Sequence, residues 1–408
     1  IVIGNASFPI LIFILNLKSL KEYIDYEEVV NDNIEDANDI NQFDPAEIVV
    51  YSRDWTIETI YNQIKLNNID LNPKFQRRNA WNDEKRSKLI ESIIMGYPIP
   101  EIVLAEDPKR KKSFIVIDGK QRLLTIAGYI DNQTYNYWDR PKLRKLSVRT
   151  DLNNIDYTQL QSNDGLNEEL REFSNASLRC TVITNFTQTD VLYDIFYRLN
   201  SGSVALSTQE LRQVLNRGAF ADYLINITNT TQPIHQVLGL ENPDKRLKDI
   251  EIILRIISFI LFPTDYRGNL RTFLDNKMQL ITQEWDKMQI KISQIYDDVN
   301  DTINYLSSIF GGYQNIGRKA TDNNFENRFN KVIFEVELFY FLQIDKNQIK
   351  NPEKFIEGFK KLCTSDNDFR SSVESSTKNI ENYRIRYTKF EKLINDSLGL
   401  EIHINPFI

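Results

Sequence analysis

The stretch FIVIDGKQRLLTIAGY, residues 114–129, places an apolar run directly before Asp-Gly-Lys-Gln-Arg and then continues with an amphipathic pattern. An apolar run of this length that ends at turn residues predicts a buried strand over 114–117. Beyond Gly119, apolar residues recur at helical spacing, which predicts a helix. The sequence therefore predicts a junction between a strand and a helix that carries several polar side chains.

Upstream of this junction the pattern is also regular. Asn82 or Asp83 can cap a helix that Gly96 then ends. A strand is expected over 101–105, and the basic cluster at 109–112 predicts a hairpin turn before the strand at 114–117. Together these elements predict a mixed α/β unit.

Beyond about residue 150, helical patterns predominate. Thr187 with Asp190 and Ser207 with Glu210 have the spacing of capping boxes, which predicts two helix starts. A long or broken helix pair is expected over 270–310. Further helices are expected over 249–262, 323–342, 352–363 and 380–398.

The N-terminal region is expected to lie outside the globular part. Residues 8–17 are apolar but too short to span a bilayer as a helix and lack a basic leader, so no secretory signal is expected. Residues 22–47 contain acidic residues and no basic one, which predicts a solvated, partly flexible arm. An alternative is an arm that folds over a basic groove of its own chain.

Composition limits the chemistry. The net charge of -7 disfavours a general nucleic-acid or membrane binder. The two cysteines lie far apart in the sequence and indicate neither a disulfide framework nor a metal site. We therefore expect a cytoplasmic protein. The two histidines, His235 and His403, lie near no nucleophile motif and no metal-ligand spacing. Pairs such as Asp275 with Lys277 are expected by chance in a chain this charged.

The junction itself offers a site for an anion. Glycine allows close backbone approach, and the free N–H groups at a helix start favour phosphate. Lys120 and Arg122 add positive charge, and Asp118 could hold a ribose hydroxyl or a phosphate-bridging metal. The alternative is a tight turn in which Asp118 caps the helix and Arg122 is paired on the surface.

Several segments in order resemble one known family. Residues 71–107 (LNPKFQRRNAWNDEKRSKLIESIIMGYPIPEIVLAED) and 117–126 (IDGKQRLLTI) resemble the N-terminal domain of the GmrSD-type modification-dependent restriction proteins. Residues 196–213 resemble the family's Arg-Leu-Asn-x-Gly and Gln-Glu-Leu-Arg segment, and 244–255 and 270–278 are weaker matches. The family is related to the ParB and sulfiredoxin-like fold.

The resemblance implies an α+β fold with a ParB/sulfiredoxin-like N-terminal domain followed by a largely α-helical domain. The implied limits are an arm at 1–47, a nucleotide-binding domain at 48–220 and a helical domain at 221–408. The family's Asp-Gly-Gln-Gln-Arg box implies nucleoside triphosphate binding and hydrolysis with Mg²⁺. In this chain, Lys120 replaces the first glutamine of that box.

The implied roles fall on matching positions only. Catalytic roles fall on Asp118, Gln121 and Arg122, with Asp118 also the expected metal ligand. The expected nucleotide-binding residues are Gln76, Arg77, Asp118, Gly119, Lys120, Gln121, Arg122, Arg198 and Asn200. Simpler roles remain open for three positions: Arg77 as a surface charge, Asn200 as a helix C-cap and Glu210 as a capping residue.

DNA contact is expected at the densest basic stretch. Its members are Arg140, Lys142, Arg144, Lys145 and Arg149, preceded by Tyr137 and Trp138. Basic residues interleaved with aromatic ones can follow a nucleic-acid backbone and stack on bases. The alternative is a solvated loop or helix.

Three functions remain open at this point. The first is a nucleotide-hydrolysing module of a prokaryotic restriction or antiphage system that couples nucleotide binding to DNA recognition. The second is a metal-dependent DNA nuclease acting through Asp118, and the third is a non-catalytic sensor that recruits a separate nuclease. Complete relatives add a His-Asn-His nuclease domain, for which this sequence has no histidine cluster. No membrane partner is expected, and the sequence predicts no oligomeric state.

Overall fold

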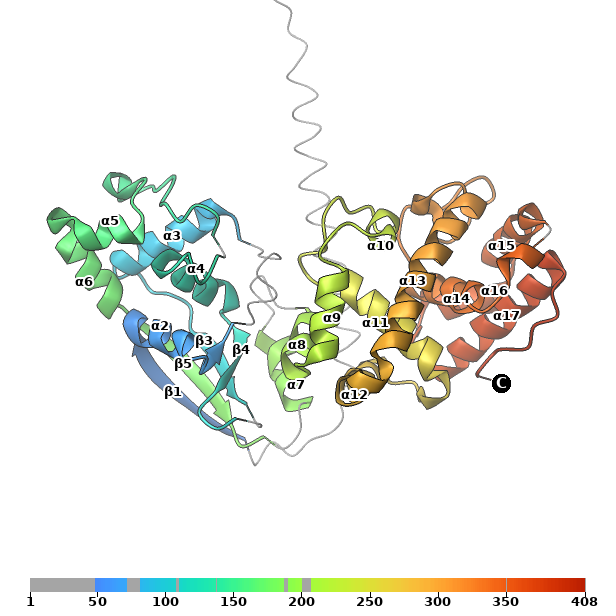
Figure 1. The fold of residues 1–408 in the computed structure, drawn as a ribbon, viewed down its shortest axis with the longest axis horizontal. Coiled ribbons are helices and arrows are strands. Elements are labelled where there is room, and N and C mark those ends of the chain that lie inside the picture. The colour runs from blue at the N-terminus through green and yellow to red at the C-terminus, as the bar shows by residue number, and fades with distance from the viewer. Residues whose placement is uncertain are drawn as a thin grey trace, which may run out of the picture.

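The computed structural model describes residues 48–71, 81–107, 110–136, 138–186, 190–199, 207–349 and 351–407. A mixed sheet with helices on both faces is followed by a helical part (Figure 1). The predicted α+β class is therefore confirmed. The likeness to ParB and sulfiredoxin-like proteins and the three domain limits stay predictions, and the acidic arm lies outside the described residues.

Within the described residues, the sheet has five strands in the order β1-β5-β3-β4-β2. β5 pairs antiparallel with β1 and parallel with β3, while β4 pairs antiparallel with β3 and parallel with β2. The predicted strands at 101–105 and 114–117 are β3 and β4, and they form the predicted hairpin. The strand bounds are Val49–Thr56 for β1, Ile69–Asp70 for β2, Ile102–Glu106 for β3, Phe114–Asp118 for β4 and Ser177–Thr184 for β5.

Helices cover both faces of the sheet. Alternate strand residues explain this: Leu104 and Val116 pack with the helices of one face, whereas Ala105 and Ile117 pack with those of the other. The first face is covered by α2 (Ile57–Lys65), α3 (Asp83–Ile94), α4 (Lys120–Ile130), α5 (Tyr157–Ser162) and α6 (Asn167–Asn175). The second is covered by α7 (Asp190–Leu199) and α8 (Thr208–Leu215).

The helical part has a hydrophobic core of its own. Its buried apolar residues form one cluster from Phe220 to Phe407, whereas the clusters on the sheet lie between Ile57 and Val214. None of the described helices is long and apolar enough to cross a membrane. The helices are α9 (Ala219–Ile227), α10 (Pro233–Val237), α11 (Lys248–Leu261), α12 (Leu270–Gln283), α13 (Trp285–Phe310), α14 (Lys331–Phe341), α15 (Pro352–Ser365), α16 (Asn367–Glu374) and α17 (Ile380–Leu398).

Several predicted helix ends are confirmed by their caps. Asn82 caps α3 by accepting from the Lys85 N–H at 2.9 Å, and Gly96 follows the helix with φ +67°. At α8, the Ser207 hydroxyl accepts from the Glu210 N–H at 3.1 Å, and the Glu210 carboxylate accepts from the Ser207 N–H at 2.6 Å. Glu210 therefore caps α8 as predicted. Thr187 lies outside the described residues.

One predicted helix begins later than expected. The periodicity placed its start near residue 323, but α14 begins at Lys331. Asn330 caps it by accepting from the N–H groups of Val332 and Ile333, both at 3.1 Å. Ala320 and Phe325 instead form an isolated β-bridge, so the prediction of helix over 323–330 is wrong. The side-chain cap at Asn330 overrides the apolar pattern upstream of it.

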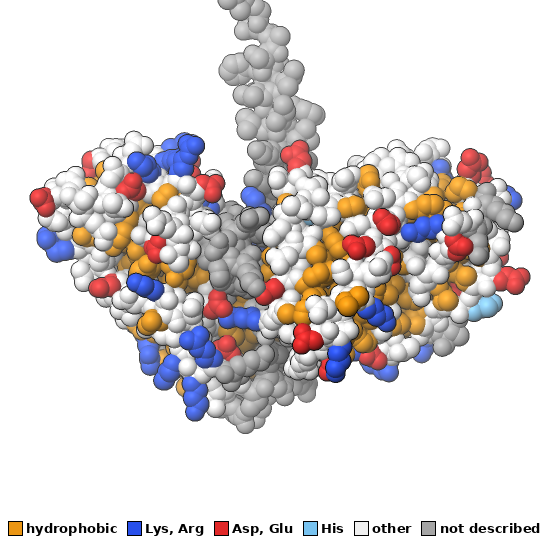
Figure 2. Space-filling view, in the orientation of Figure 1, with side chains coloured by type: hydrophobic (Ala, Val, Ile, Leu, Met, Phe, Trp, Pro, Cys, Tyr) orange, Lys and Arg blue, Asp and Glu red, His pale blue; other side chains and the backbone are white. Residues whose placement is uncertain are grey.

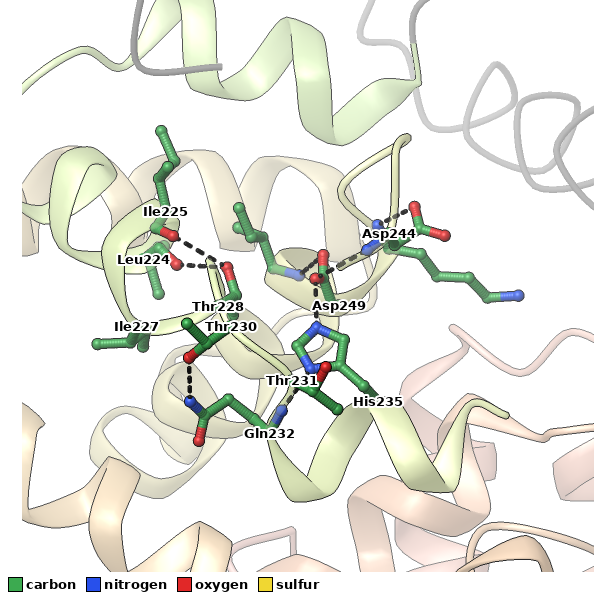
Figure 3. A network of polar contacts seen from close by, with 12 residues as sticks. Leu224, Ile225, Ile227, Thr228, Thr230, Thr231, Gln232, His235, Asp244 and Asp249 are labelled. Carbon is green, nitrogen blue, oxygen red and sulfur yellow. Dashed lines mark hydrogen bonds and ion pairs between the residues drawn. The ribbon is translucent and has the colours of Figure 1, made fainter. Parts of the chain in front are cut away.

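One of the two histidines of the helical part, His235, has a structural role. His235 and Asp249 are both fully buried, and the His235 Nε2 lies 2.8 Å from an Asp249 carboxylate oxygen (Figure 3). The His235 Nδ1 accepts from the Gln232 N–H at 2.8 Å, which places the ring proton on Nε2. The imidazole thus joins the start of α10 to the start of α11 without an exposed nitrogen. His403 is exposed.

Glu337 on α14 is a fully buried carboxyl. One of its oxygens accepts from the Gly317 N–H at 2.8 Å, and the other has no partner among the described residues. Burial raises the pKa of Glu337 well above its usual value, although the Gly317 N–H and the charge of Arg318 act in the opposite direction. The folded protein therefore keeps a proton on Glu337 that the unfolded chain loses at lower pH.

We expect Glu337→Gln to make the free energy of unfolding less dependent on pH. A raised pKa in the folded state means that the wild type loses stability as pH rises from about 4.5 through that pKa. The glutamine cannot ionise, so the variant should be the more stable protein at pH 8 and differ least near pH 4. Urea unfolding across this range measures the effect, with the exposed Glu353→Gln as a matched change of charge. Parallel pH profiles for wild type and Glu337→Gln would contradict the prediction.

Candidate functional site

The strand-to-helix junction is built around a glycine that cannot be replaced without strain. β4 ends at Asp118, and Gly119 follows in the left-handed region with φ +93° before α4 begins. A Cβ at this position would lie 2.4 Å from the Ile102 Cδ1. A bulge in the pairing of β3 and β4 lies directly beside the junction. Gly119 therefore permits both the backbone turn and close contact with β3.

The contacts of Asp118 and Arg122 differ from those expected for a tight turn in which Asp118 caps α4. The N-cap is Gly119, and no side chain caps the helix. Arg122 is only 8% exposed, and its Nη2 donates to Asp118 at 3.1 Å and to the Glu101 carbonyl at 2.9 Å. Both halves of the alternative are therefore wrong, because Asp118 does not cap and Arg122 is buried.

Two buried atoms of the junction lack a partner among the described residues. The Arg122 Nε and the Gln121 Oε1 are buried, and neither has a hydrogen-bond partner among the described residues. A buried polar atom without a partner costs free energy, so such atoms in a native structure require an explanation. One is a donor and the other an acceptor. A polar ligand at the start of α4 could satisfy both.

Lys120 lies among charged residues from three other segments. Burial lowers the pKa of Lys120, an effect that Glu210 and Asp70 oppose and Arg217 reinforces. Asp70 ends β2, Glu210 lies in the first turn of α8, and Arg217 follows the end of α8. Arg217 forms an ion pair with Asp70. The junction is thus one side of a larger charged cluster whose other side is β2 and α8.

α8 and the residue Arg217 beyond it also contain buried polar atoms without a partner among the described residues. Gln213 is fully buried, and neither its amide nitrogen nor its amide oxygen has a partner among the described residues. The Arg217 Nη2 is likewise buried and unpartnered in that part of the chain. Gln213 lies one helical turn beyond Glu210, which places both on neighbouring parts of the α8 surface.

The remaining predicted nucleotide-binding residues are not brought into this cluster by the described structure. Gln76, Arg77 and Asn200 lie outside the described residues. Arg198, at the end of α7, is 77% exposed, and its Nε donates to Asp194 at 2.8 Å. Their roles stay predictions.

Most of the predicted DNA-binding stretch is ion-paired within its own domain. Lys142 pairs with Asp156, Arg144 with Asp83, Lys145 with Glu84, and Arg149 with both Asp151 and Glu169. Trp138 is fully buried and therefore not available to stack on a base. In Figure 2, basic and acidic side chains are likewise mixed over the described part of the face shown. DNA binding by Arg140 and its neighbours stays a prediction.

A buried glutamate holds this basic segment in place. Glu91 on α3 is 5% exposed, and its Oε1 accepts from the N–H groups of Val148 and Arg149 at 3.0 and 2.8 Å. The Ser87 hydroxyl on the same helix accepts from the Arg144 N–H at 3.0 Å. The segment is therefore fixed against α3.

In the described part of the chain, no three His, Cys, Asp or Glu side chains come together as a metal site. Asp118 is 30% exposed and could still contribute one carboxylate. Mg²⁺ is commonly held by one or two carboxylates together with substrate phosphates, so a single aspartate fits such an ion.

Comparison with known proteins identifies the domain that contains the junction. The sequence model of the GmrSD restriction endonuclease N-terminal domain matches residues 57–215. The chain contains a GmrSD N-terminal domain. This match begins with α2 and ends with the last residue of α8, so it includes the junction and Gln213. The weaker resemblance over 244–255 and 270–278 lies outside it. No curated protein and no solved structure matches the chain.

The match to the GmrSD restriction endonuclease N-terminal domain supports a role in restriction and defence and an interaction with DNA. Within the GmrSD N-terminal domain, the sequence pointed to the junction but not to Asp70, Gln213 or Arg217. Gln213 lies in the segment that resembles the family's Gln-Glu-Leu-Arg motif, which is the one signal that could have indicated it.

Proposed function

We propose that the junction between β4 and α4 binds a nucleoside triphosphate, and that the domain hydrolyses it with Mg²⁺ as part of a restriction or defence system that recognises DNA. The observation that carries this proposal is the start of α4. There, Gly119 brings the backbone close to any ligand, and the buried Arg122 Nε has no partner among the described residues. Free N–H groups at a helix start and a guanidinium both favour phosphate oxygens.

Each polar residue of the junction has a distinct role in this proposal. Lys120 and Arg122 supply positive charge to the phosphates, and Lys120 does so beside the acidic residues Glu210 and Asp70. The Gln121 carboxamide, whose oxygen has no partner in the described part of the chain, orients a water molecule toward the terminal phosphate. Asp118 provides the protein ligand for Mg²⁺, which when bound neutralises charge on the phosphates.

A phosphate-release assay with the common nucleoside triphosphates and Mg²⁺ tests the proposal. Asp118→Asn and Arg122→Lys change the junction conservatively and are expected to reduce turnover at least about 100-fold, as when a transition-state contact is removed. Arg179→Lys is the matched control, because Arg179 pairs with Asp54 on the same sheet, between β5 and β1. It should turn over nucleotide as the wild type does.

The same preparations separate the alternatives. Duplex DNA added to the assay should change the rate of turnover if nucleotide and DNA recognition are coupled. Tight nucleotide binding without turnover would favour a sensor that recruits a separate nuclease. Metal-dependent nicking of plasmid DNA that Asp118→Asn abolishes would favour the nuclease. A wild-type protein that neither binds nor hydrolyses any nucleotide would refute the proposal.

A further inference from the structure

The turn between β3 and β4 carries basic side chains that no carboxylate of the described residues pairs with. The turn contains the basic cluster of the sequence, of which the structure describes Arg110, Lys111 and Lys112. All three are exposed, and none forms an ion pair within the described part of the chain. By contrast, the cations at 142–149 have carboxylate partners. An anion outside the chain gains less from a cation that already has a carboxylate beside it.

Hydrogen bonds fix the backbone of this turn. The Asp107 N–H donates to the Ser113 carbonyl at 2.8 Å, and the Ser113 N–H donates to the Arg110 carbonyl at 3.1 Å. The Glu106 carboxylate accepts from the Lys112 N–H at 3.0 Å. The basic side chains therefore project from a preformed backbone, so binding a partner requires little ordering of the turn.

Lys112 occupies a backbone conformation that glycine adopts with less strain. Its φ is +61°, in the left-handed region, which costs a residue with a Cβ roughly 1–2 kcal/mol. Its side chain is exposed and forms no ion pair with the described residues that would offset this cost. Strain that the fold itself does not require is commonly associated with a functional position.

The end of α2 adds a fourth cation beside the turn. Lys65 is the last residue of α2 and is exposed. The Arg110 Nη1 donates to the Asn67 carbonyl at 3.1 Å, which joins the turn to the segment that follows α2. We call these four side chains the hairpin patch: Lys65, Arg110, Lys111 and Lys112.

The hairpin patch has an excess of positive charge. The same turn contains two acidic residues, Glu106 and Asp107, against the four cations of the patch. The Glu106 carboxylate is engaged by a backbone N–H of the turn. In a chain with a net charge of -7, a local group of unpaired cations favours an extended anion as its partner.

We propose that the hairpin patch binds the phosphate backbone of duplex DNA. This inference rests on the proposed function, which includes recognition of DNA. Duplex DNA carries a negative charge about every 1.7 Å along its axis, so the four cations can contact phosphates at the same time. Such contacts hold the protein on the duplex without reading its sequence.

The DNA surface and the nucleotide site lie at opposite ends of one strand. β4 begins at Phe114, next to the turn, and ends at Asp118, next to α4. Its five residues separate the two ends by about 13 Å, at about 3.3 Å per residue. Changes in the hairpin patch therefore leave the junction intact, so binding of DNA and hydrolysis of nucleotide can be measured independently.

The test compares the wild type with a triple variant, Arg110→Gln with Lys111→Gln and Lys112→Gln, in the full chain. The anisotropy of a labelled duplex gives the affinity between about 50 and 200 mM salt. We expect the triple variant to bind at least about tenfold more weakly. The slope of log affinity against log salt should become less steep by about 2.7, which is about 0.9 for each lost phosphate contact.

The helical part offers a matched control. Lys354→Gln with Lys361→Gln and Arg370→Gln also removes two lysines and one arginine, all of them exposed. This control should bind duplex DNA with the affinity and the salt dependence of the wild type. An equal loss in both triple variants would show an effect of net charge alone and would overturn the inference.

A single substitution excludes loss of folding as the cause. Lys112→Gly removes one cation and relieves the left-handed strain, so its melting temperature should not fall below that of the wild type. Its affinity for duplex DNA should still fall, with a salt slope less steep by about 0.9. Phosphate release without DNA should be unchanged in this variant and in the triple variant.

The outcomes distinguish this inference from the proposed function. If the wild type binds DNA and the triple variant binds it equally well, the hairpin patch is not the DNA surface and the inference is wrong. A loss caused instead by Lys142→Gln with Arg144→Gln and Lys145→Gln would place the DNA on that segment. A wild type that hydrolyses nucleotide but binds no duplex would overturn the inference and leave the nucleotide site standing. A wild type that does neither would refute the proposed function itself.

Discussion

Replacing Glu335 by alanine is expected to lower the free energy of unfolding by roughly 3–5 kcal/mol, because it leaves a buried arginine without its counter-charge. Glu335 on α14 is 1% exposed, and one of its carboxylate oxygens accepts from the Arg255 Nε and Nη2 at 3.0 and 2.8 Å. The hydroxyls of Tyr383 and Tyr387 lie 3.5 and 3.4 Å from the same carboxylate. Urea unfolding monitored by circular dichroism measures the loss.

The double variant Arg255→Met with Glu335→Leu distinguishes the effect of the unpaired charge on stability from the effect of altered packing. When both partners of a buried ion pair are replaced by apolar groups, the cost is often small or even negative. We therefore expect the double variant to recover most of the stability that Glu335→Ala loses. If the double variant is as unstable as Glu335→Ala, the loss of stability comes mainly from altered packing around the pair and not from the unpaired charge of Arg255.

Replacing Asp275 by asparagine is expected to lower the free energy of unfolding by about 3 kcal/mol, because it weakens the contact between α8 and α12. The Asp275 carboxylate accepts from the Arg212 Nε at 2.6 Å and from the Tyr193 hydroxyl at 3.1 Å. Arg271 lies 3.8 Å from its second oxygen, and both arginines are at most 2% exposed. The asparagine keeps the size of the side chain but removes the charge that both guanidinium groups share.

Thermal and urea unfolding of Asp275→Asn should show this loss, whereas the exposed Asp322→Asn makes the same change of charge and should unfold as the wild type does. Because α8 also carries Glu210, which acts electrostatically on Lys120, the nucleotide binding proposed for the junction should weaken in Asp275→Asn together with its stability. Equal unfolding curves for the two variants would show that Arg212 and Arg271 are satisfied without Asp275.

The parts of the fold that the sequence predicted share a local cause. β3, β4 and α3 follow from short apolar runs and from caps a few residues away, such as Asn82 and Gly96. The late start of α14 was missed because apolar periodicity continues upstream of Asn330, where the side-chain cap decides the boundary. Local sequence patterns therefore predict the presence of helices and strands well. They predict an element's boundary poorly where two local signals, such as apolar periodicity and a side-chain cap, compete.

The site was predictable only where it is contiguous in sequence. Residues 118–122 could be recognised as one box because the chain passes through them without interruption. Asp70 joins them because β2 pairs in parallel with β4, and Arg217 does so because it forms an ion pair with Asp70. Neither pairing has a signal in the sequence. The burial of Arg122, in turn, depends on the Glu101 carbonyl at the start of β3.

The position of β5 in the sheet has a consequence for synthesis of the chain on the ribosome. Among the described strands, β5 is the last in sequence, but it lies between β1 and β3. Its Thr181 therefore pairs with Ser52 of β1, 129 positions earlier. Until Thr184 has emerged from the exit tunnel, β1 has no neighbour and one edge of β3 is open, and open edges favour association with other chains. A nascent chain halted before residue 177 should therefore require chaperone protection that a chain with Thr184 outside the tunnel no longer needs.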